Sequence, residues 1–418
     1  MRFKFVRAAA VLGGLGILAA GLAGCSAAEN GSTAEVKSLT LWEAQSTPSA
    51  MKSVLEGFKK STGISVNVVT IPDSFEQNLQ TKWAAGQRPD ILFYQPAPSS
   101  LANLNAKKNL QDLGDMKFVQ QTKFGLADAG TMDGVHYTAT YDFPSVFGIY
   151  YNKKVFSDNN IAIPKTVADL DSAAATLKAK GVVPFGVTGG DNWSTQIPFM
   201  EASTDLVHAG DVKKINNGSE KFTDAKWIDA FSVAPGWVSK GWVNPDYKSA
   251  QYAAMPAQLQ AGSVAMYPMA SWMAGTFTDT SDIGFFPWPS TSEAVQYQSG
   301  NVASVQLPKT GDSAREAASR KFVDYITVGQ GYKTLNAALG SPSIMKGVPD
   351  PEKVNPLLKE AASLFAGGKS LPSLDTQLAY GPSNRADLSL ALVTGSLTAQ
   401  EFASQYQDAF DKLRKLQG

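Results

Sequence analysis

Polar and aromatic side chains follow two stretches of the sequence that are predicted to be strands. They are Glu43 and Gln45 at the end of SLTLWE, and Tyr94 and Gln95 at the end of DILFY. Carboxylates and amides pair with hydroxyl groups, and an aromatic face packs against the C–H side of a pyranose ring. In α/β sheets ligands bind beyond the carboxyl ends of the strands. The four side chains are therefore suited to holding a sugar at one edge of a sheet.

The composition argues against a zinc site and against nucleic acid as a partner. The chain has two histidines and one cysteine, too few for a structural zinc site, and His136 and His208 are expected to have structural roles. Lys+Arg and Asp+Glu are both 37, without a marked charge run. A near-neutral chain lacks the basic face that a nucleic-acid-binding protein needs.

Catalytic motifs are weak in this sequence. The stretch SLFAGGKS resembles a phosphate loop, but Ser363 replaces its first glycine and a predicted helix precedes it instead of a strand. No serine lies in a G-x-S-x-G elbow, and spacing marks no pair of carboxylates as a glycosidase pair. Catalysis is not expected, and neither is a cofactor.

The elements that must position these side chains alternate between strand and helix. The predicted elements are a strand at 38–43, a helix at 49–62, a strand at 64–71, a helix at 75–85 and a strand at 90–94. Such alternation predicts a parallel α/β sheet with right-handed crossovers.

The stretch from Asp133 to Phe156 is rich in strand-forming residues but contains Pro144. Proline cannot donate a hydrogen bond to a sheet ladder, so one continuous central strand is not expected. We predict two strands, at 135–141 and 145–151, with a bend at Tyr141–Pro144 where the chain leaves one lobe and enters another.

A second block of elements follows the bend. Predicted helices cover 166–180, 314–327, 331–338, 355–365, 384–393 and 398–416, and predicted strands cover 182–187, 264–267, 283–288 and 300–307. A glycine-opened loop between 188 and 198 carries Trp193, and a further loop carries Trp272.

The N-terminus has the pattern of an export signal. Three basic residues precede an apolar, glycine-containing run that ends in Leu-Ala-Gly-Cys25 and is too short for a comfortable membrane span. This ending resembles a bacterial lipobox, which would make Cys25 the lipidated first residue; the alternative is a plain signal peptide with an incidental cysteine. We predict a signal peptide at 1–24 and a flexible tether at 25–38.

Ten motifs in order make the chain resemble a known family. They are WEA, GISV, RPDILFY, DGVHYTATY, YYNKKVF, PKTVADL, AGSVAMYPMASW, GFFPWP, FVDYI and SLTAQEF. Together they resemble the extracellular solute-binding proteins of carbohydrate ABC importers, the group that contains maltose-binding protein. The acidic and basic pair of the maltose type is replaced by Pro96-Ala97-Pro98, which argues against maltose itself.

The resemblance implies a two-lobe, periplasmic-binding-protein-like α/β fold of type II, with the ligand in a cleft between hinged lobes. It places lobe 1 at 39–141 and 302–350, and lobe 2 at 142–301 and 351–418. The expected crossovers are Tyr141–Pro144, Gln298–Val302 and one near Met345–Asp350.

The resemblance also implies further ligand-binding residues besides the four named first. They are Asp142 and Asn301 at the crossovers, Trp193 in its glycine-rich loop, Trp272 where an aromatic platform is usual, and Tyr380 before a late helix. Asp142 has a structural alternative, in which it caps Ser145 or a nearby amide. Trp42, Trp83 and Trp227 are expected in the core, while Trp237, Trp242 and Trp288 stay undecided.

The expected function is a lipid-anchored, monomeric receptor on the extracytoplasmic face of the cell membrane. It would capture a sugar, an oligosaccharide, and deliver it to the permease subunits of an ABC transporter. The alternative is a sugar-sensing lipoprotein on the same scaffold that signals to a membrane sensor, because fold alone does not separate these functions.

Overall fold

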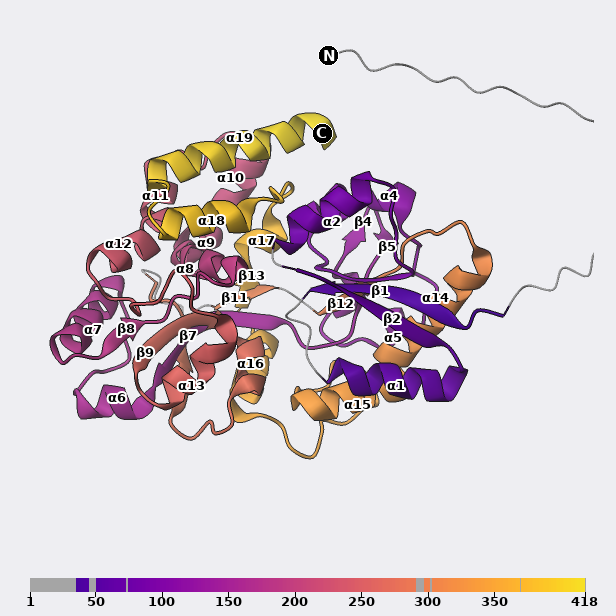
Figure 1. Cartoon of the computed structure of the whole chain (residues 1–418), viewed down its shortest axis with the longest axis horizontal. Coiled ribbons are helices and arrows are strands. Elements are labelled where there is room, and N and C mark those ends of the chain that lie inside the picture. Colours follow the sequence, from indigo (N-terminus) through magenta and orange to yellow (C-terminus); the bar gives the residue numbers. More distant parts are fainter. Residues whose placement is uncertain are drawn as a thin grey trace, which may run out of the picture. The chain divides into compact units, whose positions relative to one another are not determined.

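The computed structural model describes residues 35–44, 50–72, 74–290, 297–300, 303–368 and 370–417. Within these residues the strands form two large sheets and one two-stranded ribbon, with helices around them (Figure 1). We define each lobe as one large sheet with the helices packed on it. Each lobe is assembled from stretches far apart in the sequence.

The first lobe is built on a sheet with the strand order β2-β1-β3-β12-β6. Its strands are β1 (Ser38–Ala44), β2 (Ser65–Ile71), β3 (Ile91–Phe93), β6 (Ala139–Thr140) and β12 (Ser304–Gln306). β1 pairs in parallel with β2 and β3, as the strand–helix alternation predicts. β12 pairs antiparallel with β3 and β6, so the sheet is mixed. Both β6 and β12 connect to the other lobe, and no crossover helix forces them to run parallel to β1.

Helices cover both faces of this sheet (Figure 1). On one face α1 (Met51–Thr62), α14 (Ser313–Thr327) and α15 (Gln330–Leu339) share a core cluster, and on the other α2 (Phe75–Ala84) and α3 (Pro98–Leu104) share a second one. The smaller elements are α4 (Ala106–Asn109), α5 (Phe118–Gln121), η1 (Leu126–Asp128), β4 (Thr131–Met132) and β5 (Val135–His136).

The second lobe is built on a sheet with the order β13-β11-β7-β9-β8, and β10 also pairs with β7. Its strands are β7 (Ser145–Asn152), β8 (Val183–Phe185), β9 (Val264–Ala270), β10 (Ile283–Phe286), β11 (Tyr297–Gly300) and β13 (Ser370–Pro372). β7 and β9 run antiparallel at the centre, with Phe147 opposite Ala270 and Tyr150 opposite Tyr267. All residues of β9 are buried, which explains its continuous apolar sequence.

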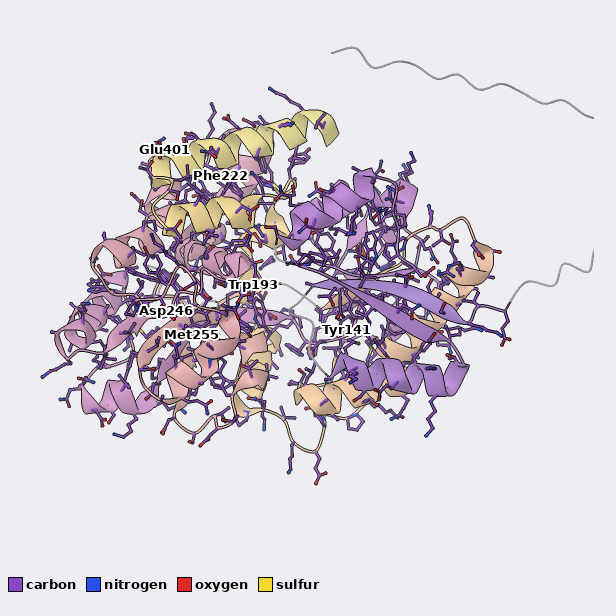
Figure 2. All side chains as sticks on the ribbon, viewed as in Figure 1. Tyr141, Trp193, Phe222, Asp246, Met255 and Glu401 are labelled. Carbon is purple, nitrogen blue, oxygen red and sulfur yellow. The ribbon has the colours of Figure 1, made fainter. Side chains whose placement is uncertain are left out.

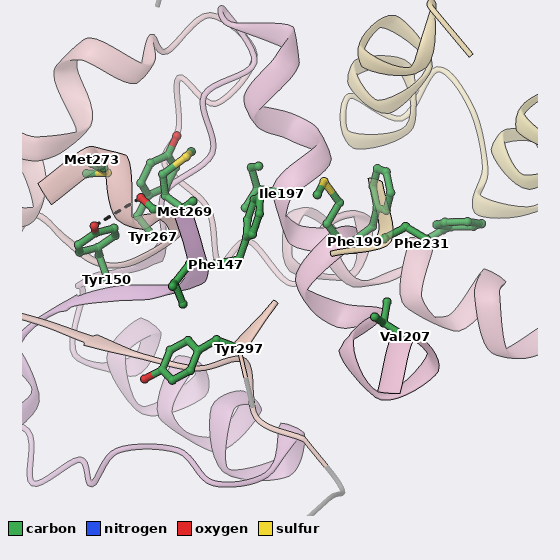
Figure 3. Packing of buried hydrophobic residues seen from close by; sticks show 14 of the residues in the cluster. Phe147, Tyr150, Ile197, Phe199, Val207, Phe231, Tyr267, Met269, Met273 and Tyr297 are labelled. Carbon is green, nitrogen blue, oxygen red and sulfur yellow. Dashed lines mark hydrogen bonds between the residues drawn. The ribbon is translucent and has the colours of Figure 1, made fainter. Parts of the chain in front are cut away.

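The core of the second lobe combines the sheet with helices from the middle and the end of the chain. Figure 3 shows Phe147 and Tyr150 of β7 beside Tyr267 and Met269 of β9. The same cluster includes Phe402, Tyr406 and Phe410 of the C-terminal helix α19 (Ala399–Gln417).

The other helices of this lobe surround the sheet. They are α6 (Lys153–Asp158), α7 (Val167–Ala179), η2 (Asn192–Gln196), α8 (Ile197–Ala202), α9 (Thr204–His208), α10 (Asp211–Asn217), α11 (Ala225–Phe231), α12 (Val233–Ser239), η3 (Tyr252–Ala254), α13 (Met255–Gln260), η4 (Ser271–Thr276), α16 (Pro356–Ala366), α17 (Leu374–Gln377) and α18 (Arg385–Val393).

The two strand predictions next to the crossovers are wrong in detail. The predicted strand at 135–141 is divided into β5, which pairs with β4, and β6, which pairs with β12. Of the predicted strand at 300–307, Ser304–Gln306 form β12 in the first sheet, whereas Gly300 is the last residue of β11 in the second. Both stretches have strand-forming sequences, but different parts of each pair with strands of different sheets.

Candidate functional site

The tryptophans divide into buried and partly exposed residues. All eight lie in the described part of the chain, and six of them are buried: Trp42, Trp83, Trp227, Trp237, Trp242 and Trp288. Trp193 and Trp272 remain partly exposed. Their ring centroids are 6.2 Å apart, with the planes inclined by 54°. Trp193 is labelled in Figure 2. Two residues 79 positions apart in the sequence thus present neighbouring aromatic surfaces.

The loop that carries Trp193 is fixed by close backbone contacts. Gly189 N–H donates to the Tyr247 carbonyl at 2.8 Å and Gly190 N–H to the Ala250 carbonyl at 2.9 Å. A Cβ atom on Gly190 would lie 2.5 Å from the Ser249 carbonyl oxygen, so this position requires glycine. Below the loop, the Thr188 hydroxyl lies 2.6 Å from Ser194 Oγ and 2.7 Å from the Tyr267 hydroxyl.

Trp272 lies just beyond the end of β9, in η4. The indole packs edge-on against Phe147 of β7, with centroids 5.7 Å apart. The preceding residue, Ser271, accepts a hydrogen bond from the Val146 N–H at 3.0 Å. The antiparallel pairing of β7 and β9 therefore determines where this tryptophan lies.

A first hollow of about 510 Å³, open to solvent, lies beside Trp272 and the crossover into β7. Its polar lining comes from Asp142, Ser145, Ser271 and Ser341. Burial raises the pKa of Asp142 to about 6, although the Phe143 N–H, 2.7 Å from Oδ1, and a hydrogen bond from Ser341 both act to lower it. A carboxyl group and three hydroxyls beside an indole form a surface suited to a polyhydroxylated ring.

Glu43 lies near the end of β1, and the charge of its carboxylate affects the pKa of the buried Tyr141 hydroxyl. Burial raises the pKa of the Tyr141 hydroxyl, and the charges of Asp142 and Glu43 raise it further. Glu43 is half-buried and lines neither of the two hollows.

A second hollow, of about 350 Å³, lies between residues of the two lobes. From the first lobe it is lined by Glu76, Tyr94, Gln95, Ala97, Ser99, Ser100 and Asn103, and from the second by Asp375, Gly381, Pro382 and Arg385. Tyr94 is mostly buried, with its ring packed 5.6 Å from that of Phe75. The Asn103 amide donates to the Gly381 carbonyl at 3.1 Å and so connects the lobes.

The second hollow contains charged groups from both lobes. Arg385 donates to the buried Asp375 and to Gln196. Burial raises the pKa of Glu76, and the positive charge of Arg385 partly opposes this. Hydrogen-bond acceptors and one fixed cation therefore face a single hollow.

Three polar side chains join the lobes directly. Ser74 Oγ, just before α2, donates to Asp387 Oδ1 at 2.8 Å. The Asn192 amide donates to Ser74 Oγ at 3.0 Å and to Asp387 Oδ1 at 2.6 Å. Asn192 Oδ1 is buried and has no hydrogen-bond partner among the described residues. The acceptor without a partner belongs to the residue next to Trp193.

The structure groups most of the predicted site residues but not all. Asp142 and Trp272 line the first hollow, Tyr94 and Gln95 line the second, and Trp193 contacts Trp272. The Tyr380 ring packs against Phe410, with centroids 5.5 Å apart, and lines neither hollow, although Gly381 and Pro382 do. Gln45, Asn301 and Cys25 lie outside the described residues.

Several residues at these sites were not predicted from the sequence. They are Ser74, Glu76, Asn103, Asn192, Tyr252, Asp375, Arg385 and Asp387. They belong to helix ends or short turns, and most of them have partners more than fifty positions away, although Arg385 and Asp375 are ten positions apart. The undecided Trp237, Trp242 and Trp288 prove to be core residues, and Trp237 stacks on Phe185 at 3.9 Å.

Neither a metal-binding cluster nor a membrane-spanning helix is present among the described residues. These residues contain no group of three or more histidine, cysteine or acidic side chains arranged to hold a metal ion. No helix among them combines the length and apolar character needed to cross a membrane.

Comparisons with known proteins agree with this architecture. The family model of the bacterial extracellular solute-binding proteins matches residues 53–363. The multiple sugar-binding protein of Streptococcus mutans is 22% identical over 367 residues, covering 85% of this chain and 86% of the relative. A maltooligosaccharide ABC transporter solute-binding lipoprotein of Streptococcus pneumoniae is 25% identical over 360 residues, covering 80% of each chain.

Solved structures share the fold. A chitin oligosaccharide binding protein superposes with a TM-score of 0.78 at 21% identity, covering 91% of this chain and 99% of the other. The binding protein RafE in complex with raffinose gives a TM-score of 0.73 at 21% identity, and the match covers 90% of this chain and 99% of the other. With its two lobes and the family model matched over most of its length, the chain belongs to the bacterial extracellular solute-binding proteins and has their type II periplasmic-binding fold.

Proposed function

We propose that this protein captures a carbohydrate, an oligosaccharide, outside the membrane and delivers it to the permease of an ABC importer. The observation that carries the proposal is the pair of partly exposed indoles, Trp193 and Trp272, beside a hollow lined by Asp142 and serine hydroxyls. Aromatic faces stack on the C–H side of sugar rings, while carboxylates and hydroxyls pair with sugar hydroxyls. The buried oxygen of Asn192, which has no hydrogen-bond donor among the described residues, is a further acceptor for a sugar hydroxyl.

Capture by lobe closure fits the way the hollows are built. Tyr94 and Gln95 in the first lobe face Asp375 and Arg385 in the second across one hollow. A ligand that touches both sides stabilises the closed form, because it gains contacts that an open form lacks.

Direct binding measurements test the proposal. We expect one or more oligosaccharides in a panel of mono- and oligosaccharides to raise the melting temperature, since a ligand at a hundred times its dissociation constant stabilises by about 2.7 kcal/mol. Calorimetry then gives the dissociation constant, and recovery of the sugar uncut separates binding from hydrolysis. Failure of every saccharide to bind would overturn the proposal.

Transport is favoured over sensing because several of the matching relatives, such as the maltooligosaccharide-binding lipoprotein of Streptococcus pneumoniae, are named as ABC transporter proteins. In a strain lacking this chain, uptake of the labelled sugar should be lost. Intact uptake with loss of sugar-dependent induction would support the sensing alternative instead.

We further propose that the protein is a monomer attached to the membrane through Cys25. Cys25→Ser should then release the protein from the membrane without changing its affinity for sugar.

A further inference from the structure

Gln196 closes the short helix η2 that carries Trp193. It is the last residue of that helix and is 7% exposed. It lines neither hollow, so any effect that it has on a bound sugar must pass through other residues. Its side-chain amide bonds to the backbone of its own helix and to Arg385, which lies 189 positions away in the sequence. Local sequence patterns do not reveal such a contact.

Arg385, the first residue of α18, determines which way the Gln196 amide points. Its guanidinium donates through Nη1 to the buried Asp375 and through Nε to the Gln196 side-chain oxygen. A guanidinium can only donate, so the amide oxygen faces Arg385 and the amide nitrogen faces away from it. That nitrogen donates to the Trp193 carbonyl at 3.0 Å. An unbroken row of hydrogen bonds therefore runs from Asp375 to the backbone of Trp193.

This row of hydrogen bonds holds one end of the Trp193 turn. Hydrogen bonds with a charged donor are about twice as strong as neutral ones, and the ion pair of Arg385 with Asp375 keeps the guanidinium in place. The backbone bonds of Gly189 and Gly190 hold the other end of the turn. A stacking surface that is fixed before the ligand arrives avoids the loss of conformational entropy on binding.

We propose that Gln196 is a positioning residue that holds Trp193 in the orientation on which a sugar ring stacks. It does so by joining the Trp193 backbone to Arg385, which lines the second hollow, so the charged hollow and the stacking surface form one connected site. The inference rests on the proposed function, because a fixed indole matters for a ligand that stacks on it. The competing explanation is that Gln196 acts on the ligand only through the position of Arg385.

The first variant is Gln196→Met, which keeps the length of the side chain but removes both hydrogen bonds. We expect the dissociation constant of the best saccharide to rise about five- to tenfold. The contribution of Trp193 to the near-ultraviolet circular dichroism of the sugar-free protein should also change. This contribution is the difference between the spectra measured with and without Trp193→Ala in the same background. Gln196→Glu keeps an oxygen for Arg385 but loses the donor to Trp193, and it provides the same test if Gln196→Met does not fold.

Gln407→Met is the matched control. Gln407 is a similarly buried glutamine of the second lobe, and its side-chain oxygen accepts from the Phe222 N–H at 2.8 Å. Its replacement should lower the melting temperature but leave the sugar affinity and the Trp193 contribution to the dichroism unchanged. The control thus separates a general loss of stability from a change at the stacking surface.

A double-mutant cycle with Trp193→Ala separates the two explanations. If Gln196 acts through Trp193, Gln196→Met should have no further effect on affinity in the Trp193→Ala background. An equal loss of affinity in both backgrounds would overturn the inference, and so would an unchanged affinity or an unchanged Trp193 dichroism in the single variant. The dichroism needs no sugar, so it tests positioning even if no saccharide binds, and that failure would overturn the proposed function alone.

Discussion

Trp272 and Trp237 are both tryptophans of the second lobe, but only Trp272 is partly exposed. For Trp272→Ala we expect the affinity for sugar to fall ten- to a hundredfold, because a stacking surface worth about 1–3 kcal/mol is removed. The melting temperature without sugar should change little, since part of the indole already faces solvent. Calorimetric titration and thermal unfolding of the variant check both expectations.

Trp237→Ala is the matched control. This indole is 3% exposed and stacks on Phe185, so its removal leaves a cavity in the core and should cost about 3–5 kcal/mol of stability. Its effect on sugar affinity should be small wherever the variant is folded. If Trp272→Ala is as unstable as Trp237→Ala, Trp272 is a core residue and the site assignment fails.

Asp142 should make stability depend on pH. Burial raises its pKa from 3.8 to about 6, so the folded protein holds this proton more tightly than the unfolded chain does. The contribution of the protonated Asp142 carboxyl to the free energy of unfolding is complete below about pH 4 and is lost as the pH rises through about 6. At neutral pH the buried charge should therefore cost about 2–3 kcal/mol.

The comparison with Asp142→Asn isolates this group, because the other carboxyls are common to both proteins. Urea unfolding at several values between pH 4 and pH 7 gives the free energy of unfolding of each. The unaltered protein should lose stability relative to the variant as the pH rises. Parallel pH profiles would show that Asp142 is better solvated than its position in the fold indicates.

The Trp193 turn depends on a close backbone contact. In Gly190→Ala the new methyl group would meet the Ser249 and Ala250 carbonyl oxygens at 2.5 and 2.9 Å. Backbone atoms cannot move aside cheaply, so the turn should shift and carry Trp193 with it. We expect weaker sugar binding together with a lower melting temperature, measured as for Trp272→Ala.

Gly236→Ala provides the contrasting substitution. Gly236 lies inside α12, and a Cβ atom there would meet nothing within 4 Å. Alanine favours a helix interior over glycine by up to about 1 kcal/mol, so this variant should be slightly more stable and bind normally. Equal losses of affinity in the two variants would contradict the role of the Gly190 contact.

Local sequence patterns predicted most elements because short-range chemistry determines them. Met51, Val54 and Phe58 recur at helical spacing, and Gly63, with a φ of 77°, ends that helix. The strand predicted at 300–307 is right for Ser304–Gln306 but wrong in its extent, because Gly300 pairs in the other sheet and no local pattern reveals which sheet a residue joins. The positions of Tyr252 and Glu76 could not be predicted for the same reason, since their partners are distant in sequence.

Closure of the whole molecule should depend on Ser74. This residue has a φ of 61°, a conformation that costs a non-glycine residue roughly 1 kcal/mol or more, and its hydroxyl does not cap α2. The hydroxyl instead bonds to Asn192 and Asp387 of the second lobe. Ser74→Ala should weaken sugar binding about five- to tenfold, because it removes contacts that hold the lobes together.

Small-angle X-ray scattering of the sugar-free protein provides the structural measurement for this variant. Ser74→Ala should have a larger radius of gyration than the unaltered protein, and saturating sugar should bring the two values together. Ser61→Ala is the control, because the Ser61 hydroxyl bonds only to the Phe58 carbonyl of its own helix among the described residues. Identical scattering and affinity for Ser74→Ala would show that these bonds do not set the degree of closure.

The interleaving of the two lobes along the chain also has a consequence for biosynthesis. The first sheet needs β12, at Ser304–Gln306, between β3 and β6, and the core of the second lobe needs Phe402, Tyr406 and Phe410. A ribosome must therefore make about three quarters of the polypeptide before one lobe can close, and nearly all of it before the other can. A nascent chain that cannot fold early remains unfolded, and passage through a secretion channel requires an unfolded chain.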